Sequence, residues 1–130
     1  MPIEDRLTDV PGLAASTRYS HAVVASGRLA FVSGQISVDD EGKVVGVDDL
    51  AAQTRQVLTN LHHVITELGA GWGDVVKLGW YVLDASEVQT IRDIRRELMG
   101  DHTPASTLVE VSALVQPEFL VEVDAVVALT

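Results

Sequence analysis

The chain has 130 residues, of which 47% are hydrophobic and 22% charged, the composition of a folded globular domain rather than a disordered chain. Nineteen acidic side chains against nine basic ones give a net charge of −10, a field that repels nucleic-acid phosphates and anionic lipids. There is no cysteine, which excludes disulfides, thiol nucleophiles and thiolate metal sites. We therefore expect a single domain over residues 1–130 that binds neither nucleic acid nor membranes.

The start of the chain and its hydropathy carry no targeting or membrane signal. Residues 1–6 lack the apolar segment of a signal peptide, and no apolar run approaches the ~20 residues that span a bilayer. A soluble cytoplasmic protein is the expectation. The net charge also repels small anions at long range, so a pocket for an acidic ligand requires local positive charge.

The first elements predicted in chain order are two short strands joined as a hairpin. Residues 21–25 and 29–33 are apolar runs, and Gly27 between them supplies the positive φ that a hairpin turn often needs. A polar turn at 39–42 then precedes a further short apolar piece, 43–47, which is a possible third strand.

A long helix is predicted next. Either Asp48 or Asp49 caps it, because a carboxylate accepts the free N–H groups of a first helical turn. Apolar residues then recur at helical spacing as far as Leu68, and Gly69 ends the helix.

The second half of the chain predicts strand, helix, strand and strand. Residues 75–83 are rich in β-branched and aromatic side chains, as strands are. Ser86 opens a capping box for a shorter helix that ends at Gly100. Residues 107–113 and 119–129 are the two closing strands.

These elements predict an α+β fold: a mixed six-stranded sheet in which each helix links parallel strands, with two helices on one face. The other face stays uncovered. At positions 120–129 the even residues mix Leu120 and Val126 with Glu122 and Asp124, so that face is partly apolar. We expect a closed homo-oligomer to bury it. The odd residues of the same segment are all apolar: Val121, Val123, Ala125 and Val127.

Glu122 is the first candidate for chemistry. Val121 and Val123 flank it, and a carboxylate withdrawn from water has a raised pKa and serves as a general base or holds a water molecule. The alternative is that Glu122 and Asp124 line a solvated or salt-bridged strand face. The pattern leaves both interpretations open.

Ser33 and Gly34 follow an apolar run, where a glycine lets a ligand approach the backbone N–H groups. A bulge or turn explains the same pair without a ligand. His62, His63 and Glu67 give at most two metal ligands on one helix face, so no metal site is expected. His102, in the loop before Pro104, is kept as a possible acid, base or anion contact.

Three arginines lie on one side of the second predicted helix, with Asp93 and Glu97 interleaved. Mixed charges at this spacing are typical of a solvated helix face rather than of a nucleic-acid patch. The three are Arg92, Arg95 and Arg96.

Several short motifs together resemble the Rid (YjgF) family over about residues 18–128. That resemblance implies a fold like that of chorismate mutase and a homotrimer with a central β-barrel, with small-molecule pockets between subunits and neither cofactor nor metal. The motifs are Tyr19-Ser20-His21-Ala22, Val32-Ser33-Gly34-Gln35, Asn60-Leu61, Asp74-Val75-Val76-Lys77, Pro104-Ala105 and Val121-Glu122-Val123-Asp124.

The resemblance also implies roles for individual residues. Catalytic members add water to a 2-imino or enamine acid and release ammonia. Tyr19 would then line the pocket, Ser33 and Gly34 would contact the ligand, and Glu122 would orient the water. The loop 104–107 would hold the carboxylate end.

Two positions depart from the pattern of those members. Ser106 stands in place of the arginine that grips the carboxylate, and Arg92 stands where many have an asparagine. Losing such a contact removes about 1.5–3 kcal/mol of binding, or roughly 10- to 150-fold. We expect a subgroup that handles simple 2-imino acids poorly, with a ligand neutral at that end and bound by Ser106 and Thr107. Whether Arg18 or His102 restores the positive charge stays open.

Three functions remain in view. The first is hydrolytic deamination of a reactive imine or enamine metabolite, with Glu122 as the catalytic residue. The second is a trimer that binds or senses a small molecule without turnover. The third, ribonuclease activity, is opposed by the net charge of −10.

Overall fold

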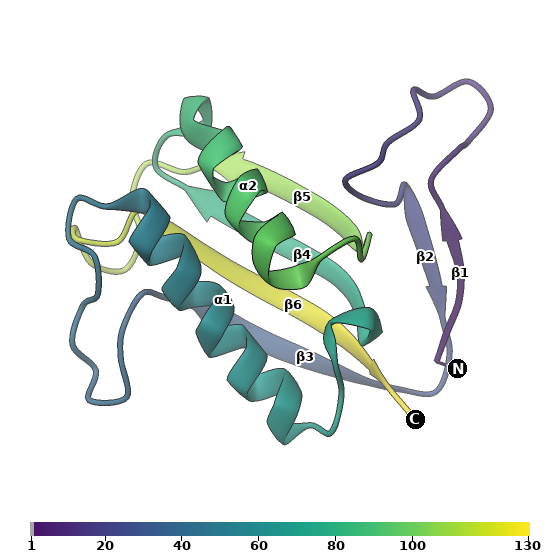
Figure 1. Cartoon of the computed structure of the whole chain (residues 1–130), viewed down its shortest axis with the longest axis horizontal. Coiled ribbons are helices and arrows are strands. Elements are labelled where there is room, and N and C mark those ends of the chain that lie inside the picture. The colour runs from purple at the N-terminus through teal and green to yellow at the C-terminus, as the bar shows by residue number, and fades with distance from the viewer. Residues whose placement is uncertain (1) are drawn as a thin grey trace.

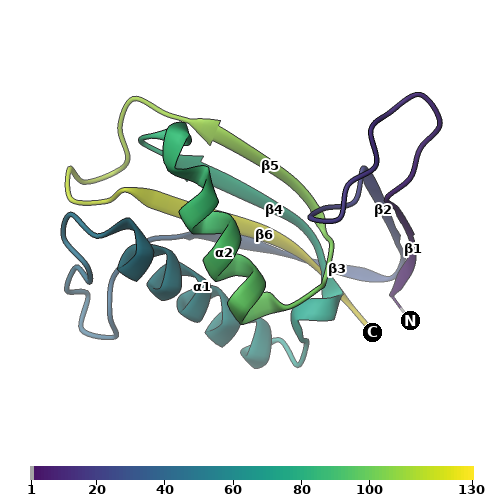
Figure 2. The same ribbon diagram turned by 45° about the horizontal axis from the view of Figure 1, so that its top comes forward.

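In the computed structural model, which describes residues 2–130, the chain has an α+β fold (Figure 1). Two helices lie on one face of a four-stranded sheet, and a separate two-stranded sheet stands beside it (Figure 2). The elements are β1 (Ile3–Leu7), β2 (Ala22–Ala25), β3 (Arg28–Gln35), α1 (Leu50–Glu67), β4 (Val75–Val82), α2 (Val88–Met99), β5 (Ala105–Glu110) and β6 (Val121–Leu129).

The main sheet has the strand order β3-β6-β4-β5 and is mixed. β4 and β5 pair in parallel, and α2 connects them. β3 and β4 both run antiparallel to β6, so they are parallel to each other, and α1 connects them. Each helix therefore links parallel strands of a mixed sheet, as predicted, and the last strand of the chain is inserted at the centre.

The predicted single sheet of six strands is wrong. The two runs expected to form a hairpin do not pair, because β2 pairs instead with β1, a strand that the sequence did not predict. The Ser26 N–H extends this pairing by donating to the Pro2 carbonyl at 2.9 Å. The piece 43–47 forms only an isolated bridge between Val38 and Val44. Strand patterns locate extended segments, but they do not name the partner of each segment.

The start of α1 decides between the two candidate caps. Asp49 is the N-cap, and its Oδ1 accepts the Ala52 N–H at 3.0 Å. Asp48 instead has a φ of 59°, in the left-handed region that side chains disfavour. Gly69 follows the helix with a φ of 75°, as expected of a helix-ending glycine.

We expect Asp49→Ala and Asp48→Gly to change stability in opposite directions. Asp49→Ala removes the cap and should lower the free energy of unfolding by about 1 kcal/mol. Asp48→Gly relieves the positive φ and should raise that free energy or leave it unchanged. Urea denaturation at equal protein concentration measures both. Equal losses in the two variants would contradict this assignment of the cap.

The start of α2 differs from the prediction. Asp84 caps the short 3₁₀ turn that precedes the helix, accepting from the Ser86 N–H at 2.9 Å and from its hydroxyl at 2.6 Å. Gln89 donates to Asp93 at 2.8 Å, so the predicted capping box is wrong. Asp84 lies two residues earlier and accepts the Ser86 N–H that the Gln89 side chain was expected to accept. The helix ends before Gly100, as predicted.

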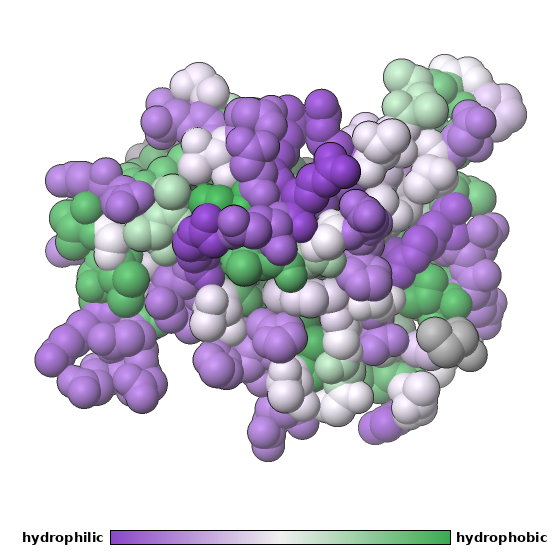
Figure 3. All heavy atoms as spheres, viewed as in Figure 1, coloured by the Kyte–Doolittle hydropathy of each residue, from purple (hydrophilic) through white to green (hydrophobic). Residues whose placement is uncertain are grey.

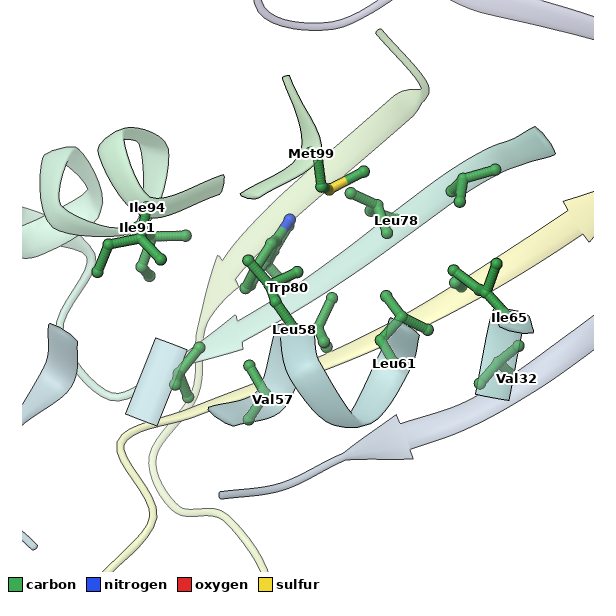
Figure 4. Close-up of a cluster of buried hydrophobic side chains, with 14 of the residues drawn as sticks. Val32, Val57, Leu58, Leu61, Ile65, Leu78, Trp80, Ile91, Ile94 and Met99 are labelled. Atoms are coloured by element: carbon green, nitrogen blue, oxygen red, sulfur yellow. The ribbon is translucent and has the colours of Figure 1, made fainter. Parts of the chain in front are cut away.

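Both helices are amphipathic. Their outer surfaces are largely hydrophilic (Figure 3), whereas their inner surfaces pack on the sheet (Figure 4). Trp80 of β4 lies between the two helices and is 2% exposed. Within residues 2–130, neither helix is long and apolar enough to cross a membrane. The core includes Val57, Leu58, Leu61 and Ile65 of α1, Ile91, Ile94 and Met99 of α2, Val32, Val75, Leu78, Val82, and the odd residues of β6.

The opposite face of the sheet has no layer on it in one chain. Alternate strand residues point to opposite faces, so Glu122, Asp124 and Val126 of β6 point away from the helices. Phe31, which pairs with Val126, is 78% exposed. The face therefore combines apolar and acidic side chains, as the alternation in β6 predicted.

Candidate functional site

A cavity of about 1020 Å³ lies between α2, β5 and the segment that connects β1 to β2. Trp80 and Leu108 are part of its wall, because they face the helices from neighbouring positions on β4 and β5. Ser106 lies two residues before Leu108 on the same face of β5. Four of the residues predicted from the sequence line this cavity: Tyr19, Arg92, His102 and Ser106.

The connection between β1 and β2 is fastened to the loop before β5. The Ser20 N–H donates to the Pro104 carbonyl at 3.1 Å, and the Ser20 hydroxyl bonds the Thr103 carbonyl. Arg6 donates to the same Thr103 carbonyl at 3.2 Å. These bonds hold the residues around Tyr19, which lines the cavity, against the loop before β5. Figure 2 shows the connection between β1 and β2 beside the start of β5.

Glu122, Ser33 and Gly34 lie on the other face of the sheet. Between the pairs Val32↔Ala125 and Gln35↔Val123, β3 has one residue more than β6, so Ser33 and Gly34 form a bulge. A Cβ added to Gly34 would lie 2.7 Å from Oε2 of Glu122. Only glycine leaves room for the carboxylate there. Ser33 and Gly34 were predicted either to contact a ligand or to form a bulge. They form a bulge, and it lies against Glu122, the predicted catalytic residue.

The surroundings of Glu122 favour the desolvated alternative over a salt bridge. Burial raises the pKa of the Glu122 carboxyl above its ordinary value, and the charge of Asp124 raises it further. No lysine or arginine in residues 2–130 forms an ion pair with Glu122. Asp124 accepts a hydrogen bond from the Tyr81 hydroxyl at 2.9 Å, which raises the pKa of that phenol. A half-buried carboxylate without a cation is suited to accept a proton from water.

The predicted site residues thus form two groups on opposite faces of one sheet. Thr107 pairs with Gly79, and it alternates with Ser106, so it belongs to the uncovered face with Glu122. One chain does not bring the two groups together. Among residues 2–130, no three His, Asp or Glu side chains gather as metal ligands, and the His62 ring instead packs 5.1 Å from that of Trp72.

Comparison with known proteins identifies the family. The family model for Endoribonuclease L-PSP matches residues 11–129. The crystal structure of YyfB from Yersinia pestis, a protein of unknown function in the Rid family, superposes with a TM-score of 0.89 and 35% sequence identity. That superposition covers 99% of this chain and 100% of the other. The chain belongs to the Rid (YjgF) family.

Two relatives with family or activity names are similar to this Rid protein over most of its length. A RutC family protein of Pyrococcus abyssi is 34% identical over 108 residues, which are 83% of this chain and 84% of the relative. The 3-aminoacrylate deaminase RutC of Acinetobacter baylyi is 33% identical over 98 residues, 75% of this chain and 77% of the relative. Deaminase activity is therefore present among the relatives of this Rid protein.

Sequence reasoning missed two features of the site in this Rid protein. The hydrogen bond between Tyr81 and Asp124 joins residues 43 positions apart and has no local signal. Arg95 lines the cavity with Arg92, although the spacing of the two was interpreted as a solvated helix face. Which side of α2 turns toward β5 is a matter of packing, and helical spacing alone does not give it.

The raised pKa of Glu122 predicts a pH-dependent stability. Since the carboxyl binds its proton more tightly in the folded chain, its contribution to stability is present below the ordinary pKa and is lost as pH rises through the raised value. Glu122→Gln stays neutral, so it should melt above wild type at about pH 7.5, and the gap should narrow toward about pH 4. Glu118→Gln, in the exposed loop before β6, is the control. A gap that does not change with pH would contradict the prediction.

Proposed function

We propose that this Rid-family protein hydrolyses the C=N bond of a small imine, or of the enamine that interconverts with it. The observation that carries the proposal is Glu122, an unpaired carboxylate with a raised pKa beside the Gly34 bulge. A relative named as a 3-aminoacrylate deaminase supports the reaction class, since 3-aminoacrylate is an enamine. We also assign the chain to a subgroup that lacks the arginine on β5, because Ser106 occupies the position.

The proposed reaction needs one group that accepts and returns a proton. Glu122 accepts a proton from water as the water oxygen bonds to the imine carbon and the C=N electron pair moves to nitrogen. The resulting carbinolamine carries a hydroxyl and an amino group on one carbon. Its amino group holds the proton that Glu122 took from the water. Glu122 then passes the hydroxyl proton to the amino nitrogen, the C–N bond breaks so that ammonia leaves, and the remaining C–O bond becomes the carbonyl. Neither a metal nor a cofactor is required for this sequence.

The site is proposed to form between subunits. Glu122 of one copy and the cavity of Tyr19 and Ser106 of the next would meet when the uncovered face packs on a neighbour. Two different surfaces in contact make a heterologous interface, and a closed assembly with such interfaces is a ring rather than a two-fold dimer. A homotrimer with its sheets around a central barrel is the arrangement that we propose. It would also bury Phe31.

A trimer that binds or senses a small molecule is the second candidate. Ser106 favours this candidate. Its hydroxyl is the polar group that β5 contributes to the cavity, at the position where the catalytic members described above have an arginine. We do not extend the ribonuclease name of the family model to this chain, because 19 acidic residues against nine basic ones oppose RNA binding.

Ammonia release from freshly generated 2-iminopropanoate tests the proposal. Wild type should exceed the uncatalysed rate. Ser106→Arg should raise kcat/KM by about tenfold or more, because it adds a charge-assisted contact to the carboxylate, whereas Ser106→Gln should not. If neither wild type nor Ser106→Arg releases ammonia above background from 2-iminopropanoate or 3-aminoacrylate, the proposed hydrolysis is contradicted.

A further inference from the structure

The cavity concentrates positive charge in an acidic protein. Of the nine lysines and arginines in the chain, four line this one cavity, and His102 lies beside them. The acidic residues in its lining are Asp93 and Asp101. Figure 3 shows strongly hydrophilic side chains over α2, on the side that faces the viewer. A chain with a net charge of −10 thus has more arginines than carboxylates in the cavity that four of the predicted site residues line.

The acidic residues on α2 do not neutralise this surplus. Glu97, which alternates with the arginines in sequence, forms an ion pair with Arg55 of α1. Asp93 accepts from the neutral Gln89 at 2.8 Å and keeps its charge, but with Asp101 it makes only two carboxylates against four arginines in the lining. Asp101 pairs with Arg96 at 3.8 Å, and both side chains are exposed. Among residues 2–130, three arginines of the lining therefore have no carboxylate partner: Arg18, Arg92 and Arg95.

Arg95 is the most buried of these three arginines. Its Nη2 donates to the His102 carbonyl at 2.7 Å, which orients the guanidinium and leaves its other N–H groups free of a partner in residues 2–130. Desolvation lowers the pKa of Arg95 below its ordinary value. A partly desolvated cation without an anion is costly, so the group is suited to an anionic ligand.

The wall of the cavity beneath the arginines is apolar. Trp80, Ile91 and Leu108 contribute to it from β4, α2 and β5. Ser106 is smaller than the arginine it replaces, so this end of β5 leaves space for a ligand group rather than filling it. The cavity therefore combines a cationic rim with an apolar wall, which suits an organic molecule that carries an anionic group.

We infer that this cavity binds a small organic dianion, with its two negative charges held by Arg92, Arg95 and Arg18. A single carboxylate is satisfied by one bidentate guanidinium, whereas a phosphate monoester or a dicarboxylate matches several. This departs from the expectation of a ligand that is neutral at the Ser106 end. The inference rests on the proposed function in one respect: the dianion is a substrate only if the protein hydrolyses it.

Titration calorimetry at fixed ionic strength and about pH 8 tests the inference with three probes. Phenyl phosphate and benzoate share a ring but differ in charge, and succinate is a dicarboxylate. Phenyl phosphate or succinate should bind at least about tenfold more tightly than benzoate, and the preferred one identifies the source of the dianion. Arg92→Ala should weaken that binding about tenfold or more. Arg92 is the primary variant because it is exposed and makes no side-chain hydrogen bond in residues 2–130.

Lys43→Ala is the control for lost charge, since Lys43 pairs with Glu41 at 3.1 Å outside the cavity. It should change binding less than twofold. Arg95→Lys keeps a cation and should retain the fold while weakening phosphate binding. Three results would overturn the inference: equal weakening by Lys43→Ala, an affinity for both phenyl phosphate and succinate no higher than that for benzoate, or no binding of either dianion at millimolar concentration. The inference would also be overturned if Arg92→Ala changed the oligomer mass but left the affinity for the dianion unchanged.

The outcome is separable from that of the proposed function. The calorimetric measurement requires no turnover, so a dianion site in a protein that releases no ammonia would contradict the proposed hydrolysis alone. Ammonia release that Arg92→Ala leaves unchanged, without dianion binding, would overturn this inference alone.

Discussion

Glu122→Gln is expected to lower kcat/KM for ammonia release by about 10²- to 10⁴-fold, because an amide cannot accept the proton of the attacking water. The change keeps the size of the side chain and its place beside Gly34. Binding of phenyl phosphate to the cavity should survive, because the arginines that hold the anion are unchanged and the substitution only removes a negative charge. Steady-state ammonia assays and calorimetry on one preparation measure both quantities.

Asp124→Asn is the matched control for that loss. Asp124 lies two residues further along the same strand face, and its bond to Tyr81 can be kept by an amide oxygen. We expect less than about tenfold loss, with the acid limb of the pH profile moved to lower pH, because removing the negative charge lowers the pKa of Glu122. If Asp124→Asn lost as much activity as Glu122→Gln, the loss in Glu122→Gln could not be assigned to the proton acceptor of the reaction.

The second large effect is structural and concerns Gln53, a completely buried amide on α1. Its Nε2 donates to the carbonyls of Gly46 at 3.0 Å and Glu118 at 2.8 Å, and its Oε1 accepts the Leu120 N–H at 2.8 Å. Gln53 thus ties α1 to the segment that leads into β6 and Glu122. Gln53→Met keeps the volume but leaves these buried backbone groups unpaired. We expect the free energy of unfolding to fall by about 2–4 kcal/mol.

Gln116→Met makes the same chemical change at an exposed position in the loop before β6. It should alter the free energy of unfolding by less than about 0.5 kcal/mol. Urea denaturation of both variants at equal protomer concentration compares them, because the stability of an oligomer depends on concentration. A loss below about 1 kcal/mol in Gln53→Met would mean that water replaces the three bonds.

The sequence was sufficient for the helices and for most strands, because their signals are local. The helical spacing up to Leu68, the glycines at 69 and 100 and the β-branched run at 75–82 each act within one element. The separate sheet was not predictable in this way. The five residues of β1 are mostly polar and give no strand pattern. β1 is a strand because it pairs with β2, which follows a long connection.

The candidate site was found residue by residue but not as an assembly. Ser106 and Glu122 were both named, yet their faces depend on the register of β5 and β6 against β4. A shift of one residue in either strand would exchange the faces. The arginines of α2 were also visible, but their missing partners were not, since Glu97 turns out to pair with Arg55 of the other helix. Site composition was therefore predictable, whereas geometry and charge balance were not.

The central claim is that two faces from two copies complete one site, and mixing inactive variants tests it directly. Glu122→Gln removes the proton acceptor, and Ser106→Trp fills the cavity. When the two are unfolded together and refolded as mixed rings, about a quarter of the sites should receive one intact face from each chain, and activity should return to about that fraction of wild type. Activity that stays at the sum of the two separate variants would contradict a shared site.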